Sequence, residues 1–302
     1  MLKTNRGEQT WFVTQPNHGA VAGYLAAHWG NDEFTAPGYF GTTADPAQLR
    51  AETILAIAEH DNGWWEWEAI PDFGELDALP LDLGDVLKDQ QAGMDRWRRG
   101  IPQFGESHPY VSLLISFHAY WLYAARTESA PDPAFVHPLF WKGAPEKLMA
   151  GPLDQARAFV TEIRALQADL AARVRRSPAT ASWVDSDSLK PHARSLQVLD
   201  GLSLWLSYPL IPVRSGEAKG FGEDPVTFLE VPRGSWNDRV AIEARPGGNR
   251  RIILDPYPFD RDPLPVSIPV RIVDHATKPS APLQAWWRSQ QEQQIHFELS
   301  AL

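Results

Sequence analysis

The feature of this sequence that most constrains its fold is a change in residue pattern near Pro209. Before that point, apolar residues recur at the three- and four-residue spacing of amphipathic helices, most clearly over about 152–176. After it, the chain is rich in Pro and Gly and carries short β-favouring runs. We therefore predict a mostly α fold, with a helical domain over 1–209 and a β-rich C-terminal extension over 210–302.

The same patterns place the individual elements. Further helices are expected at about 16–29, 86–99, 110–126 and 188–208. Strands in the extension are expected at 226–231, 240–243, 251–254 and 266–273, with a hairpin turn at Gly247-Gly248. Near the N-terminus, the apolar run Trp11-Phe12-Val13 predicts one more strand, over 9–14, that can pair with the extension.

One more helix has an unusually clear beginning. Asp45-Pro46 supplies a capping side chain and a proline suited to the first helical position, and Gln48 completes a capping box. The apolar periodicity continues to His60-Asp61, and Gly63 ends the helix. These two polar residues are therefore predicted to lie on its last turn.

Composition excludes several kinds of chemistry. The chain has no cysteine, which removes thiol catalysis and thiolate metal sites and fits a reducing, cytoplasmic location. Its net charge of −10 argues against broad binding to nucleic acid, which needs a basic face. No apolar run approaches the roughly 20 residues that span a bilayer, so no membrane segment is expected. A small molecule is the partner that we expect.

Three of the nine histidines lie in apolar helical contexts, namely His18, His60 and His118. Asp61 follows His60 directly, and Asp200 lies in an apolar helix, where an unpaired carboxylate would be costly. Imidazoles and carboxylates together form a mixed nitrogen and oxygen ligand set, which suits Mn, Fe, Co, Ni or Zn. The remaining six histidines are interpreted as structural or solvated: His28, His108, His137, His192, His275 and His296.

The order of these residues resembles the HD-domain superfamily of metal-dependent phosphohydrolases. The runs that carry the likeness are His18–Leu25, Ala56–Trp64 and Leu196–Ser203. The chain is also similar to a bacterial family of unknown function, through Gln15-Pro16-Asn17-His18, His60-Asp61-Asn62-Gly63-Trp64 and Pro256-Tyr257-Pro258-Phe259. The resemblance implies an HD-domain-like helical bundle with metal ligands on separate helices.

The resemblance also implies a set of roles. His18, His60, Asp61 and Asp200 would hold a divalent transition metal, and His118 would be an additional ligand or a proton carrier. Asp61 and His118 are the predicted catalytic residues. The helix expected over 86–99 lacks the extra histidine found in two-metal members, so one ion is expected rather than two. The implied reaction is hydrolysis of a phosphoester or phosphoanhydride of a small molecule by metal-activated water.

Two other functions stay open at this stage. In the same scaffold, a di-iron oxygenase would use His118 to complete a second metal site. A non-catalytic protein would keep the metal for structure or for binding a small ligand. Four neighbouring residues are further candidates to contact a substrate or to orient a ligand: Gln15, Asn62, Trp64 and Gln197.

Overall fold

The computed structural model describes residues 1–86, 88–127, 151–209 and 219–302. The described helices are α1 (Gln15–His28), α2 (Pro46–Ala58), α3 (Trp65–Ala69), α4 (Leu83–Val86), α5 (Gln90–Gly100), α6 (Pro109–Thr127), α8 (Leu153–Val174), α9 (Ser186–Ser207) and α10 (Leu283–Ser289). Three short 3₁₀ helices are η1 (Asn62–Trp64), η2 (Ile101–Phe104) and η5 (Ala181–Val184). The strands are β1 (Leu2–Arg6), β2 (Gln9–Val13), β3 (Val226–Ser235), β4 (Asp238–Gly248), β5 (Arg251–Asp255), β6 (Leu264–Asp274) and β7 (Glu292–Ser300).

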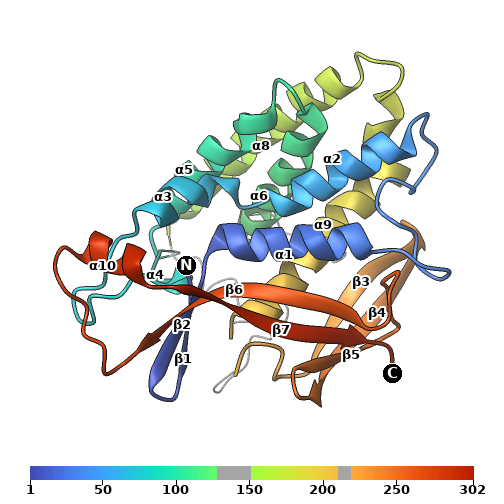
Figure 1. Ribbon diagram of the computed structural model, residues 1–302. Coiled ribbons are helices and arrows are strands. Elements are labelled where there is room, and N and C mark those ends of the chain that lie inside the picture. Colours follow the sequence, from blue (N-terminus) through green and yellow to red (C-terminus); the bar gives the residue numbers. More distant parts are fainter. Residues whose placement is uncertain (87, 128–150, 210–218) are drawn as a thin grey trace.

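The described strands form one seven-stranded sheet in the order β1-β2-β6-β7-β5-β4-β3. All neighbours are antiparallel except β5 and β7, which run parallel with Arg251 opposite Glu298. The N-terminal hairpin joins the C-terminal strands because β2 pairs with β6, with Thr10 opposite Val273. The sheet curves into a half-barrel beneath the helices (Figure 1).

The prediction of a mostly α, HD-domain-like helical bundle is therefore wrong as a description of the fold, whereas the predicted β-rich C-terminal part is confirmed. Strand β6 alternates buried and exposed residues, so one face of it, including Val266 and Ile268, needs a cover. Helix α1 lies against β6, and α9 lies against β3. Because the helices cover the apolar face of the sheet, helices and strands share one large hydrophobic core, and α10 packs with β2 and β6 in a second, smaller cluster. Residues 210–218, at the predicted boundary after residue 209, lie outside the described part.

The longer helices match the sequence patterns well, whereas the short helices α3, α4 and α10 were not predicted. Asp45 accepts a hydrogen bond from the Gln48 amide at the start of α2, as the capping box predicts. Figure 1 shows α1 and α9 next to the sheet and α8 farther from it. Along the described ranges, no helix is long and apolar enough to cross a membrane.

Two strands and a turn differ from expectation. Strand β1 was not predicted, because its only apolar residue is Leu2, and it forms by pairing with β2 around a turn in which Gly7 has φ of +60°. Strand β7 was also missed, although Ile295 and Phe297 show the alternation of a half-buried strand. The hairpin between β4 and β5 is confirmed, but its tight turn lies at Asn249-Arg250, just beyond the predicted glycines.

Candidate metal centre

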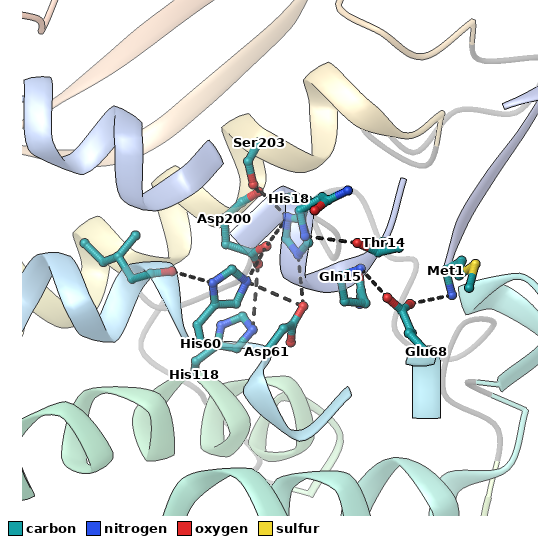
Figure 2. A network of polar contacts seen from close by, with 12 residues as sticks. Met1, Thr14, Gln15, His18, His60, Asp61, Glu68, His118, Asp200 and Ser203 are labelled. Carbon is teal, nitrogen blue, oxygen red and sulfur yellow. Dashed lines mark hydrogen bonds and ion pairs between the residues drawn. The ribbon is translucent and has the colours of Figure 1, made fainter. Parts of the chain in front are cut away.

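Five buried side chains from four parts of the chain meet at one place between the helices (Figure 2). Helix α1 supplies His18, the turn after α2 supplies His60 and Asp61, α6 supplies His118, and α9 supplies Asp200. We call these five residues the His/Asp cluster. The structure thus brings together every residue that the sequence proposed as a metal ligand.

Two glycines in α1 allow the cluster to form. A Cβ atom on Gly19 would lie 2.7 Å from the carbonyl oxygen of Ala58, and one on Gly23 would lie 2.6 Å from the Ala58 Cβ. Larger residues at these positions would push α1 away from α2. The close crossing places the His18 and His60 rings with their centroids 4.9 Å apart.

His60 and Asp61 lie beyond the end of α2, not on its last turn as predicted. The helix ends at Ala58, and η1 begins at Asn62. The chain turns sharply here because Gly63 packs on helix α5, where a Cβ atom would lie 2.1 Å from the Arg96 carbonyl oxygen. The turn lets both adjacent side chains face the same centre, which neighbouring positions of a regular helix could not do.

The distances within the His/Asp cluster pair each histidine with a carboxylate. His18 Nε2 lies 2.9 Å from Asp61 Oδ2, and His60 Nε2 lies 3.1 Å from Asp200 Oδ1. His118 Nε2 is farther away, at 3.7 Å from Asp200 Oδ2. The Asp61 side chain is 9% exposed, and the other four are between 0% and 4% exposed. Solvent therefore reaches the cluster mainly beside Asp61.

Hydrogen bonds to the other ring nitrogen fix the orientation of two of these histidines. His60 Nδ1 donates to the carbonyl oxygen of Ile57 at 2.7 Å. Ser203 Oγ donates to the Asp200 carbonyl oxygen, so it accepts from His18 Nδ1, which lies 2.8 Å away. In both rings Nδ1 carries the proton, and Nε2 faces the carboxylates. Metal-ligating histidines are commonly held in this way.

The two carboxylates of the cluster stabilise positive charge between them. Burial opposes the charged form of His60, but Asp61 and Asp200 outweigh it and raise the pKa of His60 to about 9. Burial likewise opposes ionisation of Asp61, yet His60 and His18 keep the pKa of Asp61 below its usual value. An unprotonated Nε2 would repel the carboxylate oxygen in front of it. Ring protons or a bound cation can relieve that repulsion.

A metal ion fits this donor set. Two overlapping groups, one of His18, His60 and Asp200 and the other of His60, Asp61 and His118, each offer three ligand atoms within 4.8 Å of one another. Both groups are buried. Mixed imidazole and carboxylate donors suit a divalent transition metal, as the sequence predicted. The cluster can therefore hold a metal ion.

The four predicted neighbours have separate contacts. Gln197 accepts a hydrogen bond at 2.9 Å from the buried Arg194 of the same helix, and Arg194 also donates to carbonyl groups of β3 and so ties α9 to the sheet. Asn62 Nδ2 donates to the carbonyl oxygen of Gly100 at 3.0 Å and so joins the turn to α5. Trp64 is buried three residues after Asp61. Gln15 donates its backbone amide to Glu68, and its side-chain oxygen is buried without a hydrogen-bond partner in the described chain.

Sequence reasoning missed two polar residues of this region. Ser203 orients His18, and its position one turn after Asp200 was the available signal. Glu68 is buried near the cluster, where it accepts from the Gln15 amide at 2.6 Å and pairs with the Met1 amine at 2.8 Å. Burial raises the pKa of Glu68. No spacing in the sequence marks this acid, because its partners come from the N-terminal segment.

The remaining histidines of the described chain lie outside the cluster. Their side chains contact ordinary polar partners: His28 with Asp260, His108 with Glu52, His192 with Tyr110, His275 with Thr10 and His296 with Ser267. His137 lies outside the described residues. These contacts agree with a structural role for the five.

A family model described as "Protein of unknown function (DUF3891)" matches residues 1–275. The chain therefore belongs to this family. No curated protein and no solved structure matches it significantly. The family description names no activity, and the His/Asp cluster is the feature of this chain that bears on its function.

Proposed function

We propose that this member of the DUF3891 family is a metal-dependent hydrolase of the HD-domain type, acting on a phosphoester or phosphoanhydride bond of a small molecule. The observation that carries the proposal is the pair of anchored histidines, His18 and His60, each with Nε2 within 3.1 Å of a buried carboxylate oxygen. The order of the cluster along the chain supports the superfamily assignment. Along the chain, a histidine lies on the first helix, a His-Asp pair follows the second helix, and an aspartate lies on a helix much later in the sequence.

We assign four residues to the ion and one to proton transfer. The His18–Asp61 contact is 2.9 Å and the His60–Asp200 contact is 3.1 Å, and we assign these four residues to one ion. His118 Nε2 lies 3.7 Å from Asp200 Oδ2, and His118 also belongs to a possible ligand group with His60 and Asp61. We assign His118 to proton transfer beside the ion because its contact with a carboxylate is the longest among the three histidines. A divalent transition metal bound here supplies Lewis acidity and makes water a competent nucleophile at neutral pH.

Asp61 defines the side from which water and substrate approach, because its side chain is the most exposed of the five. Its carboxylate can orient an incoming water molecule. His118 can donate a proton from Nε2 to the leaving oxygen. These are the two catalytic roles that we assign to the chain itself.

A cation near the cluster is available for an anionic substrate. Helix α5 packs on the turn at Gly63, beside the backbone of Arg96, and its Trp97 ring lies 5.4 Å from the His118 ring. On the same helix, the Arg96 guanidinium lies 4.6 Å from the ring centre of Trp64 and 4.7 Å from that of Trp67. Arg96 Nε and Nη1 are buried and have no hydrogen-bond partner among the described residues. We propose that this arginine contributes to binding a substrate phosphate.

The test is turnover by metal-reconstituted protein. Metal-free protein is loaded separately with Mn, Fe, Co, Ni or Zn and assayed with 4-nitrophenyl phosphate, bis(4-nitrophenyl) phosphate and a panel of nucleotides. We expect metal-dependent hydrolysis of at least one substrate. Loss of His118 as a proton carrier should lower kcat about 100-fold or more in His118→Gln while metal content is retained.

Two results would contradict the proposal. Metal-loaded protein that hydrolyses none of these compounds would favour a non-catalytic metal protein. Two iron ions per chain with visible absorbance would instead favour an oxygenase. His296→Gln is the matched control, because His296 bonds to Ser267 on the sheet and should leave turnover unchanged.

A further inference from the structure

A second pocket lies at the half-barrel, away from the His/Asp cluster. Its cavity of about 290 Å³ is lined by the N-terminal hairpin, the segment around Phe221, the turn between β4 and β5, and strand β7. All of its lining residues belong to the described chain. We call it the half-barrel pocket. Open ends of barrels are common places for small-ligand sites.

The floor of the half-barrel pocket is apolar. Ile252, Ile295 and Phe297 contribute to it from neighbouring strands, and each is at most 5% exposed. Trp11 and Phe221 form a wall, with ring centres 5.0 Å apart in an edge-on arrangement. This surface can bury a hydrocarbon chain or a ring.

Phe221 at the pocket has a strained backbone. Its φ is +52°, and its neighbours Gly220 and Gly222 both have φ of +68°. A bulky residue rarely adopts a positive φ, and such strain concentrates at functional sites. On the other side, Asn249 and Arg250 have φ of +49° and +58°, as both central residues of a tight hairpin turn ordinarily do. This turn places Arg250 at the same cavity as the Phe221 ring.

The rim of the pocket carries more positive than negative charge. Three arginines line it, namely Arg6, Arg250 and Arg251, against a single acid, Glu223. This local excess is opposite to the net charge of −10 of the whole chain. The net negative charge of the protein repels anions from the rest of its surface. A basic rim therefore concentrates anions at this pocket.

Arg6 is the best-placed donor of the rim. Its guanidinium lies 4.9 Å from the ring centre of Trp11 and 5.4 Å from that of Phe221. One terminal nitrogen pairs with Glu223, while Nη1 is buried and has no hydrogen-bond partner in the described chain. A small shift of the Arg6 side chain would expose Nη1 to a ligand carboxylate, and Arg251, whose Nε donates to Ser300 Oγ, adds positive charge at the exposed rim.

We infer that the half-barrel pocket binds a small amphipathic carboxylate, whose apolar part lies on the Trp11–Phe221 wall and whose carboxylate faces Arg6. The cavity volume suits a ligand of about ten heavy atoms, at the small end of ligand sites. This inference does not depend on the proposed hydrolase activity, because it uses no residue of the His/Asp cluster.

The experiment compares octanoate with its neutral analogue 1-octanol, each titrated calorimetrically into the metal-loaded protein. We expect saturable binding of octanoate and at least about 10-fold weaker binding of octanol, because the alcohol lacks the charge. Arg6→Gln should weaken octanoate binding about 10-fold or more, and Arg251→Gln should weaken it in the same direction.

Arg239→Gln is the matched control for the Arg6 substitution. Arg239 also lies over an aromatic ring, that of Trp236, and pairs with Glu230, but it does not line the pocket. Absence of saturable octanoate binding, or equal binding of octanoate and octanol, would overturn the inference. If Arg6→Gln fails to fold, the Arg251→Gln variant and the octanol comparison still decide it.

Discussion

Helix α9 contributes one residue to each of two buried polar centres, about two turns apart. The two centres differ in the charge of the groups that face their histidines. At the first, His192 accepts a hydrogen bond from the Gly38 amide at 2.8 Å and bonds through Nδ1 to the Tyr110 hydroxyl at 2.9 Å. Both ring nitrogens are satisfied by neutral groups. Burial lowers the pKa of His192 to about 3, so this imidazole stays neutral.

The second centre is the His/Asp cluster around Asp200. There the ring nitrogens of His18 and His60 face carboxylates, and the pKa of His60 is raised to about 9. His192, His18 and His60 are all fully buried, so burial does not distinguish a structural histidine from a ligand. The two kinds of histidine are distinguished by the groups that face their ring nitrogens. Neutral partners complete a hydrogen-bond network, whereas two convergent acids require a cation.

The largest expected effect separates the two centres by metal binding. Asp200→Asn should weaken the affinity for a divalent transition metal at least about 1,000-fold, because it removes a negatively charged ligand from a buried site. His192→Gln should leave the affinity unchanged. Titration of metal-free protein measures both. A variant at His192 that lost the metal would break the comparison.

The next effect concerns stability. His192→Ala should lower the free energy of unfolding by about 3 kcal/mol, since it leaves a cavity and an unsatisfied Gly38 amide. Urea unfolding of the metal-loaded variant and wild type measures the difference. A change below about 1 kcal/mol would mean that the His192 network is not structural.

The pH dependence of the two centres should have opposite signs in metal-free protein. Below pH 6.5 the unfolded chain binds a proton at His192 that the folded chain does not bind until about pH 3, so stability falls as the pH falls. His60 is protonated in the folded state up to about pH 9, so its stabilising contribution is present below pH 6.5 and lost on going to pH 9.

Each slope should reach at most about 1.4 kcal/mol per pH unit. Urea unfolding from pH 4 to pH 9.5 measures them, roughly covering both ranges. His192→Gln should flatten only the acid side, and His60→Gln only the alkaline side. Identical pH profiles for wild type and both variants would contradict the assigned protonation states.

The smallest expected effect tests the orientation of His18. Ser203→Ala removes the acceptor of its Nδ1 proton and should weaken metal affinity about 10-fold without abolishing binding. Ser267→Ala, which removes the partner of His296 on the sheet, is the control and should have no effect on metal affinity. An unchanged affinity in Ser203→Ala would show that His18 does not depend on this contact.

Much of the cluster could be predicted from the sequence, because each of its members lies in an apolar helical context or next to one. His18, His60, Asp61, His118 and Asp200 were all proposed from pattern and order, and the structure brings them together. The turn that aims His60 and Asp61 could not be predicted. It depends on the packing of Gly63 against α5, a contact between residues distant in sequence.

The fold was less predictable than its elements. Helix positions followed from periodicity and capping, as at Asp45, but the relation of helices to strands did not. A strand pattern such as that of β6 shows that one face is buried and does not say what buries it. The N-terminal hairpin illustrates the limit, since Leu2–Arg6 becomes a strand only through pairing with β2.

The most direct test of the central claim is anomalous diffraction from crystals of the protein reconstituted with Mn²⁺, recorded near the manganese absorption edge. We predict one peak per chain, within bonding distance of donor atoms of His18, His60, Asp61 and Asp200, with His118 beside it. No peak at the cluster, or a stoichiometric peak elsewhere in the molecule, would contradict it.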